Sequence, residues 1–396
     1  MEISTVCNTK TDKEALAAAI DSLQTQLSGR PDYVVAHYSV DLNPVDLMEL
    51  VRERYPGARL HGGSSCLGVI TEVGFCSESG SGFGLMGYKD SGGSFGVGAA
   101  EIGDKPSEAA KEAVLRALED ADRPGEVPAI IYMTAAPGCE EQLIEGITEV
   151  VGSDVPISGG SAADNTVSGE WHQVANDKDY TNAVVISVMF PSSDVFFGFL
   201  SGYEPTEKKG IVTKADKRSL MEIDNRPAAE VYNDWCDSSF EDVMEQGGNI
   251  LSRCTMFPLG RIVGQVGEIP YFQLSHPDNI TSEKHLVLFS EVNVGDEIYF
   301  MQGTQDSLVS RAGRVASSAL DTFSSSPDDI AGALVVYCAG CMLSVQDRLD
   351  EVVDSLNKAL PETPILGTFT FGEQGCFVGG ENRHGNLMIS VLLFTK

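Results

Sequence analysis

One arrangement of apolar and polar positions occurs three times along the chain. In the first copy the mainly apolar run "YVVAHYSV", which begins at Tyr33, predicts a buried strand. Asn43 followed by Pro44 is typical of a helix start, with a capping side chain before a first-turn proline. A second apolar run, "ARLHGG", comes after the helix. The apolar face of that helix consists of Leu47, Met48 and Val51.

The same order returns from Ala129 ("AIIYMTAAPG … VPISGGS") and from Ala333 ("ALVVYCAGC … TPILGTF"). In the third copy, Ser344 with Asp347 resembles a capping box and predicts that the helix begins there. Strand, helix and strand in this order form a βαβ unit, whose two strands pair in parallel with a nearly invariant hand. We therefore expect three βαβ units that superpose.

Several other segments alternate apolar and polar residues with period two, which predicts antiparallel strands between and after the units. Together these patterns predict an α/β protein with mixed sheets covered by helices, built around repeated βαβ units in two halves. Further helices are predicted at residues 13–27, 107–120, 226–236 and 307–323.

A polar, locally basic run, "GYEPTEKKG" at residues 202–210, predicts a linker. A chain of 396 residues is long for one hydrophobic core, so two domains are expected. The linker would divide an N-terminal domain of residues 1–206 from a C-terminal domain of residues 207–396.

Each unit ends in a strand followed by small residues: "HGGSSC", "SGGSAADN" and "LGTFTFGEQGC". Ligand-binding loops gather at the carboxyl ends of parallel strands, and glycine there lets a ligand or another chain segment approach the backbone. We expect Gly62, Gly159 and Gly367 at equivalent strand ends. The alternative is a set of tight turns that use small residues for packing. The candidate ligand-binding residues of the first two motifs are Gly62, Ser64, Ser65, Cys66, Gly159, Gly160, Ser161, Asp164 and Asn165.

The net charge of the chain limits the classes of partner that it can bind. Aspartate and glutamate number 58 against 27 lysines and arginines, a net charge of -31, which repels phosphate backbones and anionic membranes and argues against nucleic acid. No apolar run reaches the roughly 18 residues of a membrane span, and "MEISTVCNTK" lacks the features of a signal peptide. Nine dispersed cysteines favour reduced thiols. We expect a cytoplasmic protein without membrane insertion.

Motifs for catalysis are sparse. The sequence lacks GxxxxGK[ST] and HExxH. The CxxC motif "CAGC" (Cys338 to Cys341) fits buried structural thiols, redox-active thiols or half of a zinc site. A nucleophilic Cys66 or Cys341 would need a histidine placed beside it, and "CAGC" contains none. We therefore expect a protein that is not an enzyme, with a cysteine-dependent enzyme or redox protein as the alternative.

Several motifs, taken in order, resemble those of the FIST sensory domain: "GGSSCLGV", "GGSAADN", "RSLMEIDNRPAAEVY" and "CMLSVQDR … ILGTFTFGEQG … HGNLMISVLL". The resemblance covers nearly the whole chain and both its N-terminal and C-terminal FIST segments. It departs from the family where "MLSVQD" separates Cys341 from Arg348, because the family places its cysteine closer to the arginine. The resemblance implies a ligand-sensing module of bacterial signalling, whose output passes to a separate histidine kinase or cyclic-nucleotide enzyme.

The resemblance also implies two classes of ligand. The NosP-like subset of the family binds haem and senses nitric oxide, and His384 in "RHGNLMI" matches the family position for a histidine before an asparagine. His384 is therefore the candidate metal ligand and His61 the second candidate. A histidine bonded only to backbone is the alternative for His384.

The other ligand class is an amino acid, whose carboxylate suits the fork of an arginine. Arg348 and Glu373 supply opposite charges in the third unit. For Asp164 a capped turn is the alternative, since Asp-Asn favours turns. The remaining candidate ligand-binding residues are Cys341, Arg348 and Glu373.

Overall fold

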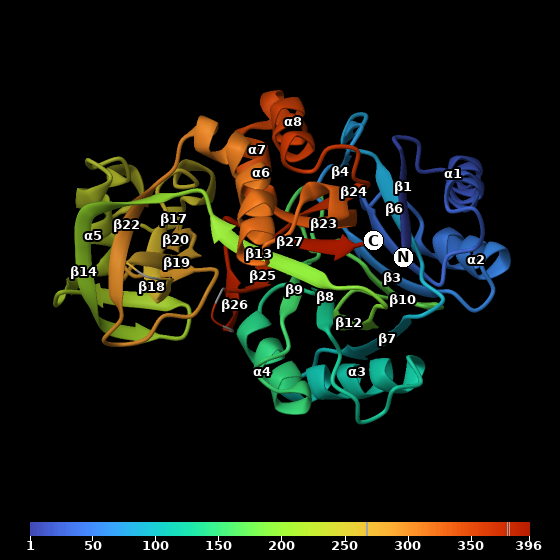
Figure 1. Ribbon diagram of the computed structural model, residues 1–396. Coiled ribbons are helices and arrows are strands. Elements are labelled where there is room, and N and C mark those ends of the chain that lie inside the picture. Colours follow the sequence, from blue (N-terminus) through green and yellow to red (C-terminus); the bar gives the residue numbers. More distant parts are fainter. Residues whose placement is uncertain (267, 378, 380) are drawn as a thin grey trace.

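The computed structural model describes residues 1–266, 268–377, 379 and 381–396 and shows a mixed α/β fold (Figure 1). Three six-stranded sheets form a core, and a nine-stranded sheet lies to one side of it, at the left of Figure 1. Helices cover mixed sheets that are built around parallel strand pairs. The predicted fold class is therefore confirmed.

Each core sheet is built around one repeat of the chain, in which strand, helix, strand, helix and strand are followed by a hairpin and a last strand. The first repeat contains β1 (Glu2–Asn8), α1 (Lys13–Gln26), β2 (Tyr33–Tyr38), α2 (Pro44–Arg54), β3 (Arg59–Ser64), β4 (Val69–Thr71), β5 (Gly74–Cys76) and β6 (Phe83–Lys89). The second contains β7 (Ser94–Glu101), α3 (Pro106–Asp120), β8 (Ile130–Ala135), α4 (Glu140–Val151), β9 (Ile157–Ser161), β10 (Gln173–Ala175), β11 (Lys178–Tyr180) and β12 (Ala183–Phe190). The third contains β13 (Val195–Ser201), α6 (Gln305–Thr322), β23 (Ile330–Cys338), α7 (Ala339–Ser344), α8 (Leu349–Ala359), β24 (Ile365–Thr370), β25 (Glu373–Cys376), β26 (Asn382–Gly385) and β27 (Met388–Thr395).

The third repeat is interrupted after β13 by a segment of residues 204–302, called here the inserted segment, which forms the nine-stranded sheet. Its own hydrophobic cluster includes Leu220, Tyr232 and Phe300. Its elements are β14 (Glu204–Asp216), β15 (Ser219–Ile223), β16 (Arg226–Pro227), α5 (Ala228–Trp235), β17 (Gly248–Asn249), β18 (Leu259–Val266), β19 (Ile269–Ser275), β20 (Pro277–Ile280), β21 (Leu286–Leu288) and β22 (Glu297–Gln302).

The hairpin of each repeat leaves its own sheet and extends the sheet of another repeat. The strand order is β1-β6-β2-β3-β10-β11 in sheet 1, β7-β12-β8-β9-β25-β26 in sheet 2 and β13-β27-β23-β24-β4-β5 in sheet 3. The first repeat thus completes sheet 3, the second completes sheet 1 and the third completes sheet 2. This cyclic exchange ties the three sheets into one core.

The repeated glycines occupy equivalent positions on the second parallel strand of each unit, as predicted. They lie inside the strands, however, and not in turns after them, because neighbouring sheets approach closely there. A Cβ atom at Gly63 would lie 2.5 Å from Cγ2 of Thr134, and one at Gly160 would lie 2.4 Å from Cγ2 of Thr370. The parallel pairs are Gly62–Ala36, Gly159–Met133 and Gly367–Val335.

The inner faces of the three sheets share one hydrophobic core, which explains why their strands are apolar on both faces. Helix pairs cover the outer faces: α1 and α2 on sheet 1, α3 and α4 on sheet 2, and α6 and α8 on sheet 3. The shared core includes Val35 and Met86 of sheet 1, Tyr132 and Val185 of sheet 2, and Leu334 and Leu392 of sheet 3.

The further predicted helices are confirmed within two residues at each end as α1, α3, α5 and α6. The predicted helix start at Ser344 is wrong: Ser344 ends α7 and its hydroxyl donates to the Gly340 carbonyl. The predicted linker at residues 202–210 is also wrong, because residues 204–216 form the continuous strand β14. The domain boundary between residues 206 and 207 stays a prediction. None of the helices in the described part of the chain is long and apolar enough to cross a membrane.

Candidate functional site

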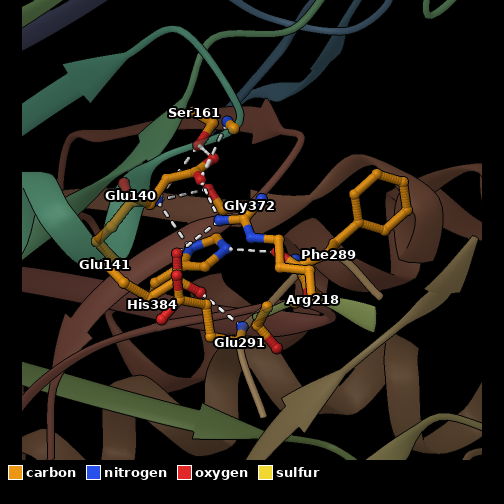
Figure 2. A network of polar contacts seen from close by, with 12 residues as sticks. Glu140, Glu141, Ser161, Arg218, Phe289, Glu291, Gly372 and His384 are labelled. Atoms are coloured by element: carbon orange, nitrogen blue, oxygen red, sulfur yellow. Dashed lines mark hydrogen bonds and ion pairs between the residues drawn. The ribbon is translucent and has the colours of Figure 1, made fainter. Parts of the chain in front are cut away.

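A network of charged and polar side chains lies where the carboxyl ends of β8 and β9 meet the inserted segment (Figure 2). Glu140 begins α4, and its side chain is only 2% exposed. Its Oε1 accepts a hydrogen bond from the Ser161 hydroxyl at 2.7 Å. Its Oε2 accepts one from the Gly138 backbone N–H at 3.1 Å. A buried carboxylate of this kind needs a positive partner.

Arg218 provides that partner from the turn between β14 and β15 of the inserted segment. Its Nη2 lies 2.7 Å from Oε2 of Glu140 and 2.6 Å from Oε2 of Glu141. The other oxygen of Glu141 accepts the Glu291 backbone N–H at 2.9 Å. Figure 2 shows these groups converging from both sides of the interface. The two carboxylates therefore fasten the inserted segment to sheet 2.

The electrostatics of the network favour charged carboxylates. Burial acts to raise the pKa of Glu140, but the positive charges of His384, when protonated, and of Arg218 outweigh it and lower that pKa to about 2. The pKa of Glu141 is lowered by the same balance. Burial opposes the charge of Arg218, yet the two carboxylates raise its pKa. All three groups are thus ionised near neutral pH.

His384 on β26 lies beside this network with a fully used imidazole ring. Its Nε2 faces the Phe289 carbonyl oxygen at 3.1 Å, and its Nδ1 faces the Gln374 amide nitrogen at 3.2 Å. A carbonyl only accepts and an amide nitrogen only donates, so Nε2 donates to the Phe289 carbonyl and Nδ1 accepts from the Gln374 amide. In this arrangement His384 offers no free nitrogen to a haem iron, which would have to displace one of these partners.

His61 is held in a similar way at the junction of sheets 1 and 2. Its Nδ1 lies 2.8 Å from the Ser187 hydroxyl and its Nε2 lies 2.9 Å from the Thr134 hydroxyl. The ring is fully buried, which moves its pKa well below the usual value. Among the described residues, no group of three or more His, Cys, Asp and Glu side chains is placed to hold a metal ion.

The turn residues of the first two motifs join sheets and cap loops. Asp164 accepts backbone N–H bonds from Thr166, Ser168, Gly169 and Glu170, so the capped-turn interpretation is confirmed. The Asn165 amide oxygen accepts the Leu67 N–H at 2.8 Å. Ser64 accepts the His172 N–H, and Ser65 accepts the Phe369 N–H. Cys66 lies buried beside them.

The structure does not bring Arg348 and Glu373 together as a clamp. Arg348 is on the surface and pairs with Asp306 at 2.8 Å and with Glu351 at 2.7 Å. Glu373 is buried, and its oxygens accept bonds from the Thr370 hydroxyl and the Met388 N–H. Burial holds the pKa of Glu373 well above its usual value.

Of the residues predicted from the sequence, the network includes Ser161 and His384, and Gly159 and Gly160 pair with its supporting strand β25. The residues that sequence reasoning missed are Glu140, Glu141, Arg218 and Gln374. The run "GCEE" directly after β8, with two acids in the first turn of a helix, was an available signal for the two glutamates. Arg218 gives no local signal, because it lies 78 residues from Glu140 in another sheet.

These features define an α/β protein in which a three-sheet core meets an inserted sheet across a charged network. The FIST N domain matches residues 32–226 and the FIST C domain matches residues 228–376. The chain therefore belongs to the FIST family, whose domains sense small ligands in signalling proteins.

Solved structures with similar folds are distant. A cyanuric acid hydrolase from A. caulinodans is 8% identical, with a TM-score of 0.39 over 100% of this chain and 99% of that one. A second cyanuric acid hydrolase, described as an innovation by structural concatenation, is 9% identical, with a TM-score of 0.38 and the same coverage. PurLQS from Thermotoga maritima is 9% identical, with a TM-score of 0.21 over 100% of this chain and 72% of that one. No curated protein matches the chain. With TM-scores below 0.5, these likenesses do not bear on the function.

Proposed function

We propose that this protein is a non-enzymatic sensor that binds a small ligand and regulates a separate histidine kinase or cyclic-nucleotide enzyme, in the bacterial cytoplasm. Its membership of the FIST family supports the sensing role. The observation that carries the proposal is the charged network of Glu140, Glu141 and Arg218, which joins two different sheets. A ligand that displaces one of these charged side chains changes the contact between the inserted segment and sheet 2, and a partner protein can recognise that change.

The chemistry of the network favours an amino acid as the ligand. Two carboxylates suit an ammonium group, and a guanidinium suits a carboxylate. Glu140 is buried, but the side chains of Glu141 and Arg218 keep 22% and 21% of their surface exposed, so solutes reach the rim of the network. Arg218 thereby takes the role that the sequence assigned to Arg348.

Haem with nitric oxide is the second ligand class, and it rests on the family resemblance and on His384. Both ring nitrogens of His384 already have hydrogen-bond partners, which favours an amino acid over haem as the ligand. The enzyme alternative is weakened at Cys66, because burial and the nearby charge of Asp164 raise the pKa of that thiol to about 12. A thiol with that pKa is a poor nucleophile at neutral pH.

Thermal shift and calorimetry with the common amino acids, and separately with haem, test the proposal. We expect at least one amino acid to bind and to raise the melting temperature of the wild-type protein. Arg218→Gln should abolish that shift, whereas Arg348→Gln, which removes a surface ion pair, should retain it. Loss of binding in Arg348→Gln with retention in Arg218→Gln would move the site to Arg348. Binding of haem alone would replace the amino acid as ligand.

A further inference from the structure

A second buried charge lies outside the network, where α6, the end of β23 and the start of α7 meet. Arg311 of α6 is fully buried. Its Nη1 donates to the Leu387 carbonyl at 2.7 Å, and its guanidinium lies 4.6 Å from the centre of the Tyr337 ring. Nε and Nη2 are buried with no hydrogen-bond partner in the described part of the chain. A buried guanidinium with two unpaired nitrogens calls for an anion close by.

The acidic side chain near Arg311 does not supply that anion. Glu373 is buried and already bonded to Thr370 and Met388, and burial holds its pKa well above the usual value, which favours its neutral form. The other acidic group in the cluster is the thiol of Cys341. It is fully buried, and its Sγ lies 3.4 Å from the Tyr203 hydroxyl.

Cys341 has a second thiol next to it. Cys338 precedes α7 and Cys341 is the third residue of that helix, so the two side chains are neighbours across one turn. Burial opposes ionisation of Cys341, but the bond from Cys338, the charge of Arg311 and the Tyr203 hydroxyl outweigh it and lower its pKa. Burial and the neighbouring Cys341 raise the pKa of Cys338. The surroundings therefore favour the thiolate form at Cys341 and the protonated form at Cys338.

We propose that Cys338 and Cys341 form a hydroperoxide-sensitive dithiol, which gives the sensor a second input besides its ligand. The Cys341 thiolate attacks one peroxide oxygen and the O–O bond breaks, leaving a sulfenic acid on Cys341 and hydroxide, which is protonated to water. The Cys338 sulfur then attacks the Cys341 sulfur, the S–O bond breaks, and the Cys338 proton leaves with the hydroxide as water. Two thiols and one hydrogen peroxide become one disulfide and two waters, so the peroxide is reduced by two electrons.

The location of the dithiol connects it to the inserted segment. Tyr203, which contacts Cys341, immediately precedes β14, where the chain enters that segment. The Tyr203 ring packs on Gly303, where the chain leaves it: a Cβ atom there would lie 2.4 Å from the ring. The Arg311 side chain packs on Gly202 in the same way, since a Cβ atom at Gly202 would lie 2.6 Å from Cδ of Arg311. When the disulfide forms, Arg311 loses the negative charge of the Cys341 thiolate beside it. This change disturbs the two places, at Tyr203 and Gly303, where the chain enters and leaves the inserted segment.

The test oxidises the folded wild-type protein with hydrogen peroxide and maps thiols by mass spectrometry after quenching. We expect the peptide that carries Cys338 and Cys341 to lose two hydrogens, and a thiol reductant to restore them. Cys254 is the matched control, because it is equally buried but burial raises its pKa. The dithiol should react more than about tenfold faster than Cys254, since the thiolate is the nucleophile. In Cys338→Ser, a dimedone adduct should accumulate on Cys341.

Three results would overturn the proposal. Wild-type protein that keeps both thiols under peroxide while folded, yet forms the disulfide when denatured, would show that the fold blocks the reaction. Equal rates of oxidation at Cys254 and at the dithiol would show that peroxide reaches both through a general opening of the protein. A disulfide that leaves amide hydrogen exchange in residues 204–302 unchanged would refute the link to the inserted segment. These readouts use the wild-type chain and do not depend on amino-acid binding, so they fail or succeed separately from the proposed function.

Discussion

At the scale of single residues, the charged network depends on Arg218, because it neutralises two carboxylates from another sheet. Arg218→Met should leave Glu140 buried without a cation, which costs about 3 kcal/mol of unfolding free energy. Urea denaturation at neutral pH measures this loss. Arg348→Met is the control, since its exposed ion pairs are worth only about 0–1 kcal/mol. Equal effects of the two substitutions would contradict the role given to Arg218.

The pH dependence of that loss follows from the pKa of Glu140. Its folded-state pKa of about 2 lies below the value of about 4.3 for an unfolded glutamate. The stabilisation is therefore fully present above the unfolded value and is lost as pH falls through the folded value. The difference between wild type and Arg218→Met should shrink as the pH is lowered from 6 towards 3. A difference that stays constant would show that Glu140 does not carry the effect.

His384 supports a second prediction at this scale. If haem binds through His384, the wild-type protein mixed with haem should show a Soret band that His384→Ala abolishes or shifts. The substitution also strands Gln374 and the Phe289 carbonyl, so it should cost about 1–3 kcal/mol of stability. His285→Ala is the control for the loss of an imidazole. A wild-type protein that shows no Soret shift would remove haem from the candidate ligands.

Single residues were predictable where their chemistry is local. The turn at Asp164 was recognisable because its side chain accepts hydrogen bonds from backbone N–H groups within a few residues. His384 was recognisable only as a residue close to a strand: it is the third of the four residues of β26, and not the start of the last strand, β27. Its partner Phe289 and the pair Glu140–Arg218 were not, because they join separate sheets and no periodic pattern records such contacts.

At the scale of elements, glycine sets how closely sheets 2 and 3 approach. Gly160→Ala would place a methyl group 2.4 Å from Cγ2 of Thr370 and 2.8 Å from Cγ1 of Val336. Overpacking of this kind costs about 1–3 kcal/mol. Gly103→Ala is the matched control, because nothing lies within 4 Å of its Cβ position. Thermal denaturation should show a clear loss for Gly160→Ala and almost none for Gly103→Ala; similar melting temperatures would contradict the packing argument.

The βαβ units were predictable because long buried strands and amphipathic helices leave strong periodic signals, as Tyr33–Tyr38 and Pro44–Arg54 show. The exchanged hairpins were not. Strands such as Val69–Thr71 and Gln173–Ala175 have three residues each, too few for a pattern. Their pairing partners lie in other repeats, and only tertiary packing chooses them.

At the scale of the whole molecule, the exchanged hairpins and the charged network should make the chain unfold as one unit. No repeat completes its own sheet, so the core has no part that can unfold alone. The inserted segment has its own hydrophobic cluster, and its contacts with the core include the Arg218 network, the two crossings at Tyr203 and Gly303, and the bond from the Asn386 N–H to the Leu274 carbonyl. We therefore expect the contacts between the inserted segment and the core to be the first to break during unfolding.

The two tryptophans of the chain report on these two parts separately. Trp171 lies in the loop between β9 and β10 of the second repeat, where its indole donates to the Thr181 carbonyl, and Trp235 ends α5 in the inserted segment. In Trp171→Phe and Trp235→Phe, the remaining tryptophan follows one part during urea unfolding. We expect the two transitions to coincide, which is the mark of a single cooperative unit. Adding Arg218→Met to each variant should separate them, with Trp235 reporting the earlier transition. Transitions that already differ without that substitution would show that the inserted segment is an independent domain, and transitions that still coincide with it would assign the coupling to the other contacts between the segment and the core, such as the bond from the Asn386 N–H to the Leu274 carbonyl.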